Sequence, residues 1–209
     1  LACGDVNVVN IGFSPEVIDS VTPFANTLST AEAAQHIPCR AYNAHKGSTG
    51  HVFVIAGSVG MSGAAALVSR AAMLAGAGVV TVGCPRSLND ILEIKLTEVM
   101  TFPLPEVRKK RCLSMRALGL LRKSVQKADV VTVGPGLGTY YETKELVRRF
   151  ISEYNGRIVL DADGINAFEG DMESLRSAPC EIVITPHAGE LAKLTGISIG
   201  DIIADPFKA

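Results

Sequence analysis

From residue 51 onwards, short apolar runs alternate with longer segments rich in helix-forming residues. The apolar runs, which we expect to be strands, span residues 51–56, 79–82, 129–133, 157–160 and 181–184. The segments between them, which we expect to be helices, span residues 62–75, 114–127, 142–153 and 188–194. Continuous β-branched runs that alternate with helices are typical of a parallel sheet with both faces covered. The pattern therefore predicts an α/β fold.

The first 50 residues follow a weaker pattern. A short apolar alternation over residues 6–11 predicts a strand, and Gly12 and Pro15 predict the turn after it. A short helix is expected near residues 30–36, inside a connection that leads to the first strand of the sheet.

These patterns divide the chain at residue 30. We interpret residues 1–29 as an N-terminal tail or interdomain junction, and residues 30–209 as one domain. The first residue is Leu1, and the last five, which end at Ala209, resemble neither a capped helix nor a finished strand. We therefore expect both ends to be cut.

Composition narrows the classes of function. Hydrophobic residues make up 47% and charged residues 20% of the chain, which supports a core and argues against disorder. The formal net charge is -1, so nucleic acid is not an expected partner. No apolar run is long enough to span a bilayer and no signal peptide is recognisable, so we expect no membrane association.

The cysteines are odd in number and scattered, without a CxxC pair. They are Cys3, Cys39, Cys84, Cys112 and Cys180. This spacing suggests neither a zinc site nor a disulfide framework. Free thiols fit a reducing compartment, and we expect a cytoplasmic protein.

A glycine-rich loop follows the first strand. It contains Gly57, Ser58, Gly60 and Gly63, and its glycines recur at every third position after Gly57. The spacing matches neither the dinucleotide fingerprint nor a P-loop. Glycines still allow the backbone to approach a ligand closely, and a helix N-terminus favours anions. Tight packing of strand against helix explains the same glycines equally well.

A second glycine loop follows the third strand. Gly134, Gly136 and Gly138 lie within five residues, and Thr139 and Glu142 form a capping-box pattern. The loop therefore leads into a helix N-terminus whose free amides can receive phosphate. A purely structural turn is the alternative.

Polar side chains follow the fourth strand. Asp161, Asp163 and Asn166 are suited to a metal, a ribose or a substrate hydroxyl. The alternative is that Asp163 caps a helix while Asp161 is solvated.

The fifth strand ends in a helix start. Thr185 is expected to be the cap and Pro186 the first helical residue, which puts His187 in the first turn. A structural or merely exposed histidine is the alternative. Four such loops on one rim predict a cleft for a phosphorylated ligand.

The combination of motifs resembles the ADP/ATP-dependent NAD(P)H-hydrate dehydratase family of the ribokinase-like superfamily. The matching segments, in the family's order, are 45–47, 50–52, 56–65, 75–78, 134–138, 160–166 and 185–190. The resemblance implies a three-layer sandwich with a mainly parallel sheet and helices on both faces. Residues 5–20 look like the junction that follows an epimerase domain in bifunctional members.

The resemblance implies a repair reaction on hydrated NADH or NADPH. In the family, ADP or ATP activates the ring hydroxyl as a phosphate, and elimination restores the dihydropyridine. The residues expected to contact or line the site of the hydrated cofactor are Ala65, Gly136, Gly138 and His187. Those expected around the transferred phosphate or its Mg²⁺ are Asp161, Asp163, Asn166 and Glu190. A homo-oligomer is also implied.

The sequence departs from the family pattern at the catalytic base, which is an aspartate in the family. The family's catalytic aspartate lies in a Gly-Thr-Gly-Asp motif, and these 209 residues contain no such motif, so we expect this aspartate to lie beyond Ala209. The fold should then be truncated at the C-terminus, and this chain by itself should have negligible dehydratase activity. The alternatives are a ribokinase-like small-molecule kinase, such as a hydroxyethylthiazole kinase, and a non-catalytic nucleotide-binding module.

Overall fold

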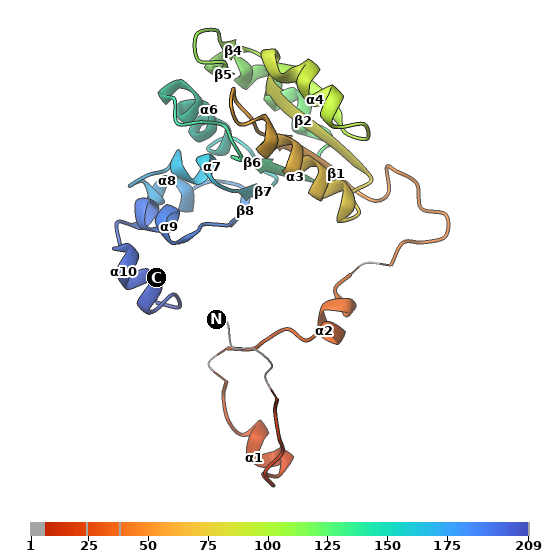
Figure 1. The fold of residues 1–209 in the computed structure, drawn as a ribbon, viewed down its shortest axis with the longest axis vertical. Coiled ribbons are helices and arrows are strands. Elements are labelled where there is room, and N and C mark those ends of the chain that lie inside the picture. Colours follow the sequence, from red (N-terminus) through yellow and green to blue (C-terminus); the bar gives the residue numbers. More distant parts are fainter. Residues whose placement is uncertain (1–6, 24, 38, 209) are drawn as a thin grey trace. The chain divides into compact units, whose positions relative to one another are not determined.

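The computed structural model describes residues 7–23, 25–37 and 39–208 (Figure 1). The chain divides into two units, residues 1–41 and 42–209. The domain boundary expected at residue 30 stays a prediction. Leu1 and Ala209 lie outside the described residues, so the expectation that both ends are cut stays a prediction as well.

The described residues of the N-terminal unit form two short helices. These are α1 (Pro15–Asp19) and α2 (Thr30–Gln35), and α2 begins with a capping box between Ser29 and Glu32. The expected helix near residues 30–36 is thus confirmed. The strand expected over residues 6–11 is wrong for its described part, residues 7–11, which has no strand pairing. The apolar side chains there are exposed, and an extended segment without a neighbour to pair with is not a strand.

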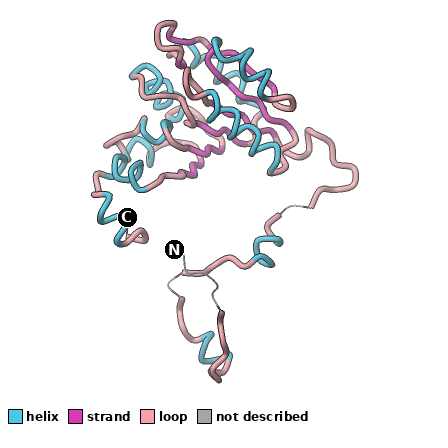
Figure 2. The backbone as a smooth tube through the Cα atoms, viewed as in Figure 1, coloured by secondary structure: helices cyan, strands magenta, loops and turns pink. Residues whose placement is uncertain are grey.

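A six-stranded parallel sheet forms the centre of the second unit (Figure 2). Its strands are β1 (His51–Ile55), β2 (Val79–Pro85), β3 (Met100–Leu104), β6 (Val130–Val133), β7 (Arg157–Leu160) and β8 (Glu181–Ile184). Their order is β3-β2-β1-β6-β7-β8, and every neighbouring pair is parallel. All five expected strands are present. The sequence pattern missed β3, an edge strand that contains Pro103, because proline argues against a strand except at an edge.

Alternate residues of the strands enter two separate cores. Phe53 and Ile55 of β1 face one core, whereas Val54 faces the other. The first core is closed by α5 (Leu118–Ser124), α6 (Tyr141–Ile151), α7 (Asp163–Asn166) and α9 (Ala188–Thr195). The second is closed by α3 (Ser62–Leu74) and α4 (Asn89–Lys95). The remaining helices are α8 (Met172–Arg176) and α10 (Ile199–Ala204). Helices thus cover both faces, as expected.

The helix expected over residues 114–127 is divided. Two 3-10 turns, Met115–Ala117 and Val125–Lys127, flank α5. Ala117, Leu121 and Val125 are all buried at a spacing of four residues, so the segment keeps one apolar face against the sheet.

A small antiparallel hairpin, which the sequence pattern did not predict, follows β3. Its strands are β4 (Glu106–Val107) and β5 (Cys112–Leu113). Two hydrogen bonds fix its base: Ser87 N donates to Glu106 Oε2 at 3.0 Å, and Thr143 Oγ1 donates to Leu113 O at 2.7 Å. The hairpin is therefore held between the ends of β2 and α6.

The helices of the described part of the chain include none with the length and apolar content needed to cross a membrane.

Candidate functional site

The four loops singled out in the sequence follow β1, β6, β7 and β8. These strands are neighbours in the sheet and all run in the same direction, so the four loops lie side by side at one edge. The connections from β1 and β6 leave in opposite directions, since β1 leads to β2 on one side and β6 to β7 on the other. In open α/β sheets such a reversal of strand order opens a crevice for ligands.

The two glycine loops are joined at this switch point. Gly57 N donates to Pro135 O at 2.9 Å, and Ser58 Oγ donates to Gly136 O at 2.8 Å. Ser58 is only 4% exposed, so its hydroxyl acts between the loops and not toward solvent. A Cβ added at Gly136 would lie 2.9 Å from Met61 Cβ. Close packing of the loops therefore explains Gly136.

The other glycines of the first loop are open. A Cβ added at Gly60 or Gly63 would meet nothing within 4 Å, and both residues are exposed. This part of the loop is where backbone is accessible to a ligand.

Two helix N-termini face the switch point without side-chain caps. The N-cap residues are Met61 for α3 and Tyr140 for α6, and neither makes a side-chain capping bond in the described part of the chain. The capping box expected from Thr139 and Glu142 is wrong, because Glu142 Oε1 instead accepts a hydrogen bond from Met115 N at 3.0 Å. Uncapped amides at a helix N-terminus favour anions such as phosphate.

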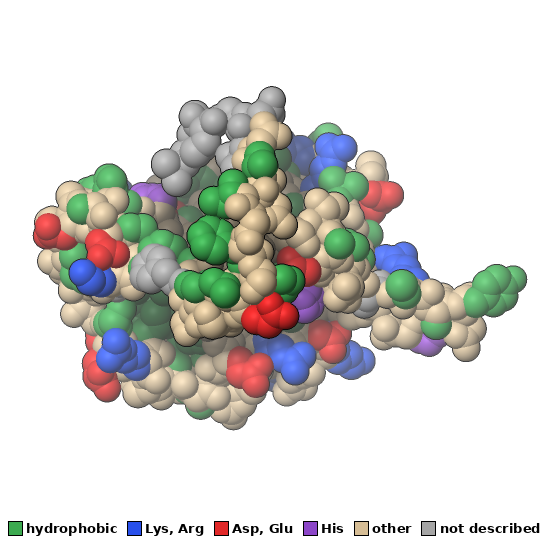
Figure 3. All heavy atoms as spheres, turned by 90° about the horizontal axis from the view of Figure 1, so that it is seen from below, with side chains coloured by type: hydrophobic (Ala, Val, Ile, Leu, Met, Phe, Trp, Pro, Cys, Tyr) green, Lys and Arg blue, Asp and Glu red, His purple; other side chains and the backbone are tan. Residues whose placement is uncertain are grey.

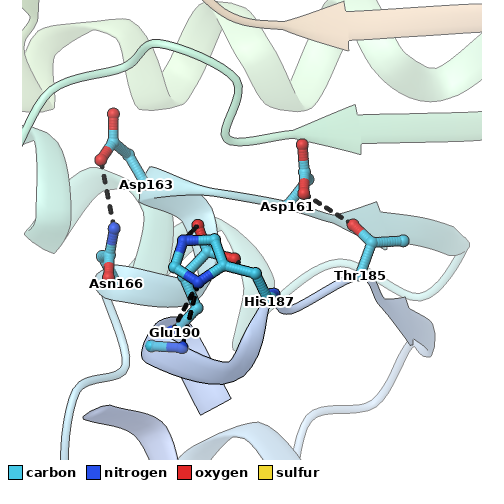
Figure 4. Close-up of polar contacts among 7 residues, drawn as sticks. Asp161, Asp163, Asn166, Thr185, His187 and Glu190 are labelled. Atoms are coloured by element: carbon cyan, nitrogen blue, oxygen red, sulfur yellow. Dashed lines mark hydrogen bonds and ion pairs between the residues drawn. The ribbon is translucent and has the colours of Figure 1, made fainter. Parts of the chain in front are cut away.

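Asp161 is directed to the loop after β8 (Figure 4). Its Oδ1 accepts a hydrogen bond from Thr185 Oγ1 at 2.7 Å, while its Oδ2 has no partner among the described residues. The next residue, Ala162, has φ +50°, a strained value for a side chain-bearing residue. This turn separates Asp161 from Asp163, so the two carboxylates have different partners.

Asp163 connects β7 to the second glycine loop. Its Oδ2 accepts a hydrogen bond from Gly138 N at 2.8 Å, and its Oδ1 accepts one from Asn166 Nδ2 at 3.3 Å. Asp163 is the first residue of α7 and not its N-cap, which is Ala162. Since its carboxylate already occupies the Gly138 amide, Asp163 positions the loop, and a phosphate at that amide would have to displace it.

His187 is the N-cap of α9 (Figure 4). Its Nδ1 accepts hydrogen bonds from Gly189 N and Glu190 N at 3.0 and 3.3 Å. This leaves the proton on Nε2, which lies 3.2 Å from Glu190 Oε1. The expectation that Thr185 caps this helix is wrong, since the histidine takes that place. Its side chain is 73% exposed, so the ring is accessible at the rim.

Ala65 lies beneath the first glycine loop. It is 0% exposed and belongs to the core formed with Val54 and Ala56, and a Cβ added at Gly57 would lie 3.1 Å from its methyl group. Its side chain therefore packs beneath the loop, and the expectation that Ala65 lines the substrate site stays a prediction.

The described rim residues do not form a complete Mg²⁺ site by themselves. Within residues 7–23, 25–37 and 39–208, no three His, Cys, Asp or Glu side chains gather to hold a metal. Mg²⁺ commonly binds through one or two carboxylates together with substrate phosphates. The free Oδ2 of Asp161 supplies one such ligand at most, so the described residues alone do not fit a resident ion.

The catalytic aspartate was expected beyond Ala209, and nothing in the structure tests that position. The last described residue is Lys208, and Ala209 itself lies outside the described residues. Near the end of the chain, Asp201 belongs to α10, where its Oδ2 accepts a hydrogen bond from Ser198 Oγ at 2.6 Å. Asp201 thus takes part in the start of that helix, and the position of the catalytic aspartate stays a prediction.

The thiol of Cys84 does not supply a nucleophile. The four described cysteines are free, and Cys3 lies outside the described residues. Cys84, on β2, is 0% exposed, and burial together with the carboxylates of Glu106 and Glu93 raises its pKa to about 12. It is therefore a neutral thiol near pH 7.

The sequence pattern did not place the β4–β5 hairpin at this rim. Val59 N of the first glycine loop donates to Arg111 O in the hairpin turn at 3.2 Å. The signal in the sequence was the run of four consecutive cations from Arg108 to Arg111, in a chain whose formal net charge is -1.

Comparison with known proteins assigns the family. The family model described as NAD(P)H-hydrate dehydratase matches residues 52–205. The bifunctional NAD(P)H-hydrate repair enzyme Nnr of Moorella thermoacetica is 36% identical over 202 residues, covering 97% of this chain and 38% of that protein. The ADP-dependent (S)-NAD(P)H-hydrate dehydratase of Streptococcus pneumoniae is 32% identical over 160 residues, covering 77% of this chain and 51% of that protein.

A solved structure shares the fold. A ribokinase-like superfamily protein of Enterococcus faecalis superposes with a TM-score of 0.64 and 24% identity, covering 78% of this chain and 54% of that one. The expected ribokinase-like fold is thus confirmed. The chain spans about two fifths of the length of the first curated relatives that it matches.

Proposed function

The chain belongs to the NAD(P)H-hydrate dehydratase family, and we propose that the protein containing it repairs hydrated NADH or NADPH with ADP or ATP as the phosphoryl donor. The observation that carries this proposal is the pair of glycine loops joined at the switch point, with two uncapped helix N-termini beside them. A substrate with a pyrophosphate and a nucleotide co-substrate both need such amide-rich, anion-binding backbone.

The chemistry is a phosphoryl transfer followed by an elimination. The hydroxyl of the hydrated ring gives up its proton as it takes the phosphoryl group from the nucleotide, and loss of phosphate together with a proton from the adjacent ring carbon restores the dihydropyridine. Within this chain, the amides at the start of α3 and α6 hold phosphates, and the exposed ring of His187 contacts the hydrated cofactor. Asp161 orients a hydroxyl through its free Oδ2, whereas Asp163 and Ser58 position the second glycine loop.

We further propose that Mg²⁺ enters bound to the nucleotide and screens the charge of its phosphates. It would then need no separate site on the protein. The four free cysteines support a reducing compartment, and hence the cytoplasm. Nucleic acid is not a proposed partner, because the formal net charge of the chain is -1. On the face drawn in Figure 3, basic and acidic side chains are intermixed.

A homo-oligomer is also proposed, through the outer side of α3 and α4. At about 100° per residue, Leu67 and Leu74 project opposite the buried Ala65 and Ser69. Leu67 is 73% exposed, Leu74 77% and Ile94 of α4 84%. These exposed apolar side chains lie on the outer side of the two helices beside the exposed Arg70, and a second copy would cover them through a two-fold contact. Sedimentation velocity that shows only monomers at micromolar concentration would rule out this contact.

The function is tested with the full-length protein, hydrated NADPH or NADH, and ADP or ATP with Mg²⁺. We expect the dihydropyridine absorbance to return only when both the hydrate and a nucleotide are present. A parallel reaction with hydroxyethylthiazole and ATP distinguishes the repair enzyme from the alternative, a small-molecule kinase. Phosphorylation of the thiazole, or nucleotide binding without turnover of either hydrate, would refute the repair function.

A further inference from the structure

The turn of the β4–β5 hairpin carries four consecutive cations, Arg108, Lys109, Lys110 and Arg111. All four are exposed, and none of them forms an ion pair with a described residue. With a net charge of -1 over the whole chain, this is a local concentration of positive charge and not part of a basic surface. Like charges on adjacent residues repel, so the turn gains from an anionic partner.

The turn is held beside both glycine loops. The carbonyl of Arg111 accepts the hydrogen bond from Val59 N at 3.2 Å, and Val59 lies within the loop after β1. The ammonium of Lys110 lies 5.9 Å from the centre of the Tyr140 ring, and Tyr140 is the N-cap of α6. The turn therefore lies next to the two helix N-termini, with the ammonium of Lys110 at the start of α6.

The hairpin does not depend on a ligand for its position. Its base is fixed to Ser87 and Thr143 by the two hydrogen bonds described above. Arg111 itself has φ +50°, which a non-glycine residue adopts only when its surroundings hold it there. A turn that is anchored in this way can recognise an anion without a large entropic cost of ordering on binding.

Hydrated NADH and hydrated NADPH, the two cofactor forms that the proposed reaction would repair, differ in one group. The NADPH form carries a phosphomonoester that the NADH form lacks, and such a group has a charge of about -1.5 to -2 near pH 7. The pyrophosphate, which both forms share, is matched by the uncapped amides of α3 and α6. The cationic turn lies outside those amides, so it is placed for an additional phosphate.

We propose that the Arg108–Arg111 turn binds the phosphomonoester of hydrated NADPH and makes the enzyme prefer this form to hydrated NADH. The inference rests on the proposed repair function and adds the substrate preference. Arginine and lysine at the rim of a site attract a phosphate over a distance of about 8 Å at physiological ionic strength, so the preference falls as salt is added.

The test compares two charge-matched variants of the full-length protein. In the first, Arg108→Gln, Lys109→Gln and Lys110→Gln neutralise the turn but leave the anchoring Arg111 in place. In the control, Lys123→Gln, Lys127→Gln and Arg176→Gln remove three exposed cations at the opposite, amino-terminal edge of the sheet. Both kcat/KM for the two hydrates and the affinities for NADP⁺ and NAD⁺ by calorimetry are measured.

We expect the turn variant to lose about tenfold or more in kcat/KM for hydrated NADPH and in affinity for NADP⁺. The values for hydrated NADH and NAD⁺ should stay within about twofold, and the control should keep the wild-type preference. An unchanged preference in the turn variant, or an equal loss for both hydrates, overturns the inference. Wild-type protein that turns over neither hydrate instead refutes the repair function on which it rests.

Discussion

Replacing Gly134 with alanine is expected to lower the free energy of unfolding by about 4 kcal/mol or more, at the upper end of single substitutions. An added Cβ would lie 1.7 Å from Asp161 O and 2.8 Å from Gly164 N. These are backbone atoms of the neighbouring strand end, which cannot move aside as a flexible side chain does. Gly134 also has φ +132°, a conformation open almost only to glycine.

Denaturation in urea followed by circular dichroism measures this loss. The matched control is Gly119→Ala, because Gly119 lies in α5 and an added Cβ would meet nothing within 4 Å. Alanine there should stabilise the helix by about 0.5–1 kcal/mol. If Gly134→Ala unfolds at the wild-type urea concentration, the close approach of the β6 and β7 ends is not as described.

Replacing Gly136 with alanine is expected to reduce kcat/KM for both hydrates by about 100-fold or more. Its Cβ would lie 2.9 Å from Met61 Cβ and 3.0 Å from Ala64 Cβ, so the two glycine loops must separate. Separation breaks the Ser58–Gly136 hydrogen bond of 2.8 Å and displaces the start of α3. Displacement of binding groups by about 1 Å costs on this order in rate.

The comparison for this prediction is Gly138→Ala. Gly138 also has a positive φ, +80°, but an added Cβ would meet Ser58 Oγ at 3.5 Å, which is an ordinary contact. Both variants carry the conformational strain, and only Gly136→Ala forces the loops apart. Steady-state kinetics with hydrated NADH and NADPH, alongside unfolding curves for each variant, separates the two effects. Equal activity in the two variants would show that loop separation does not control binding.

Strands and loop positions were predictable because they depend on short-range signals. Each of the five apolar runs forms a strand of the sheet, and parallel strands place their following loops on one edge whatever their order. The polar residues after β7 and β8 could therefore be assigned to the same rim without knowledge of the pairing.

The partners of the polar side chains were not predictable. Local patterns favoured Thr139 and Thr185 as caps, but Tyr140 and His187 hold those places. Glu142 bonds to Met115 instead of its own helix, because the preceding hairpin brings an unpaired amide to it. Such choices depend on neighbours that are distant in sequence, and a local pattern cannot contain them.

The central place of β1 also has a consequence during protein synthesis. The first glycine loop can pack against β2 early, but its partner loop is encoded 78 residues after Ser58. At about 5–20 residues per second, the ribosome needs about 4–16 s to supply that segment. During this interval the β6-facing edge of β1 is an unpaired parallel strand edge, which is prone to pair with other chains. The anion-binding crevice is thus completed only after Gly136 has been synthesised, and the nascent chain is most exposed to wrong strand pairing before that point.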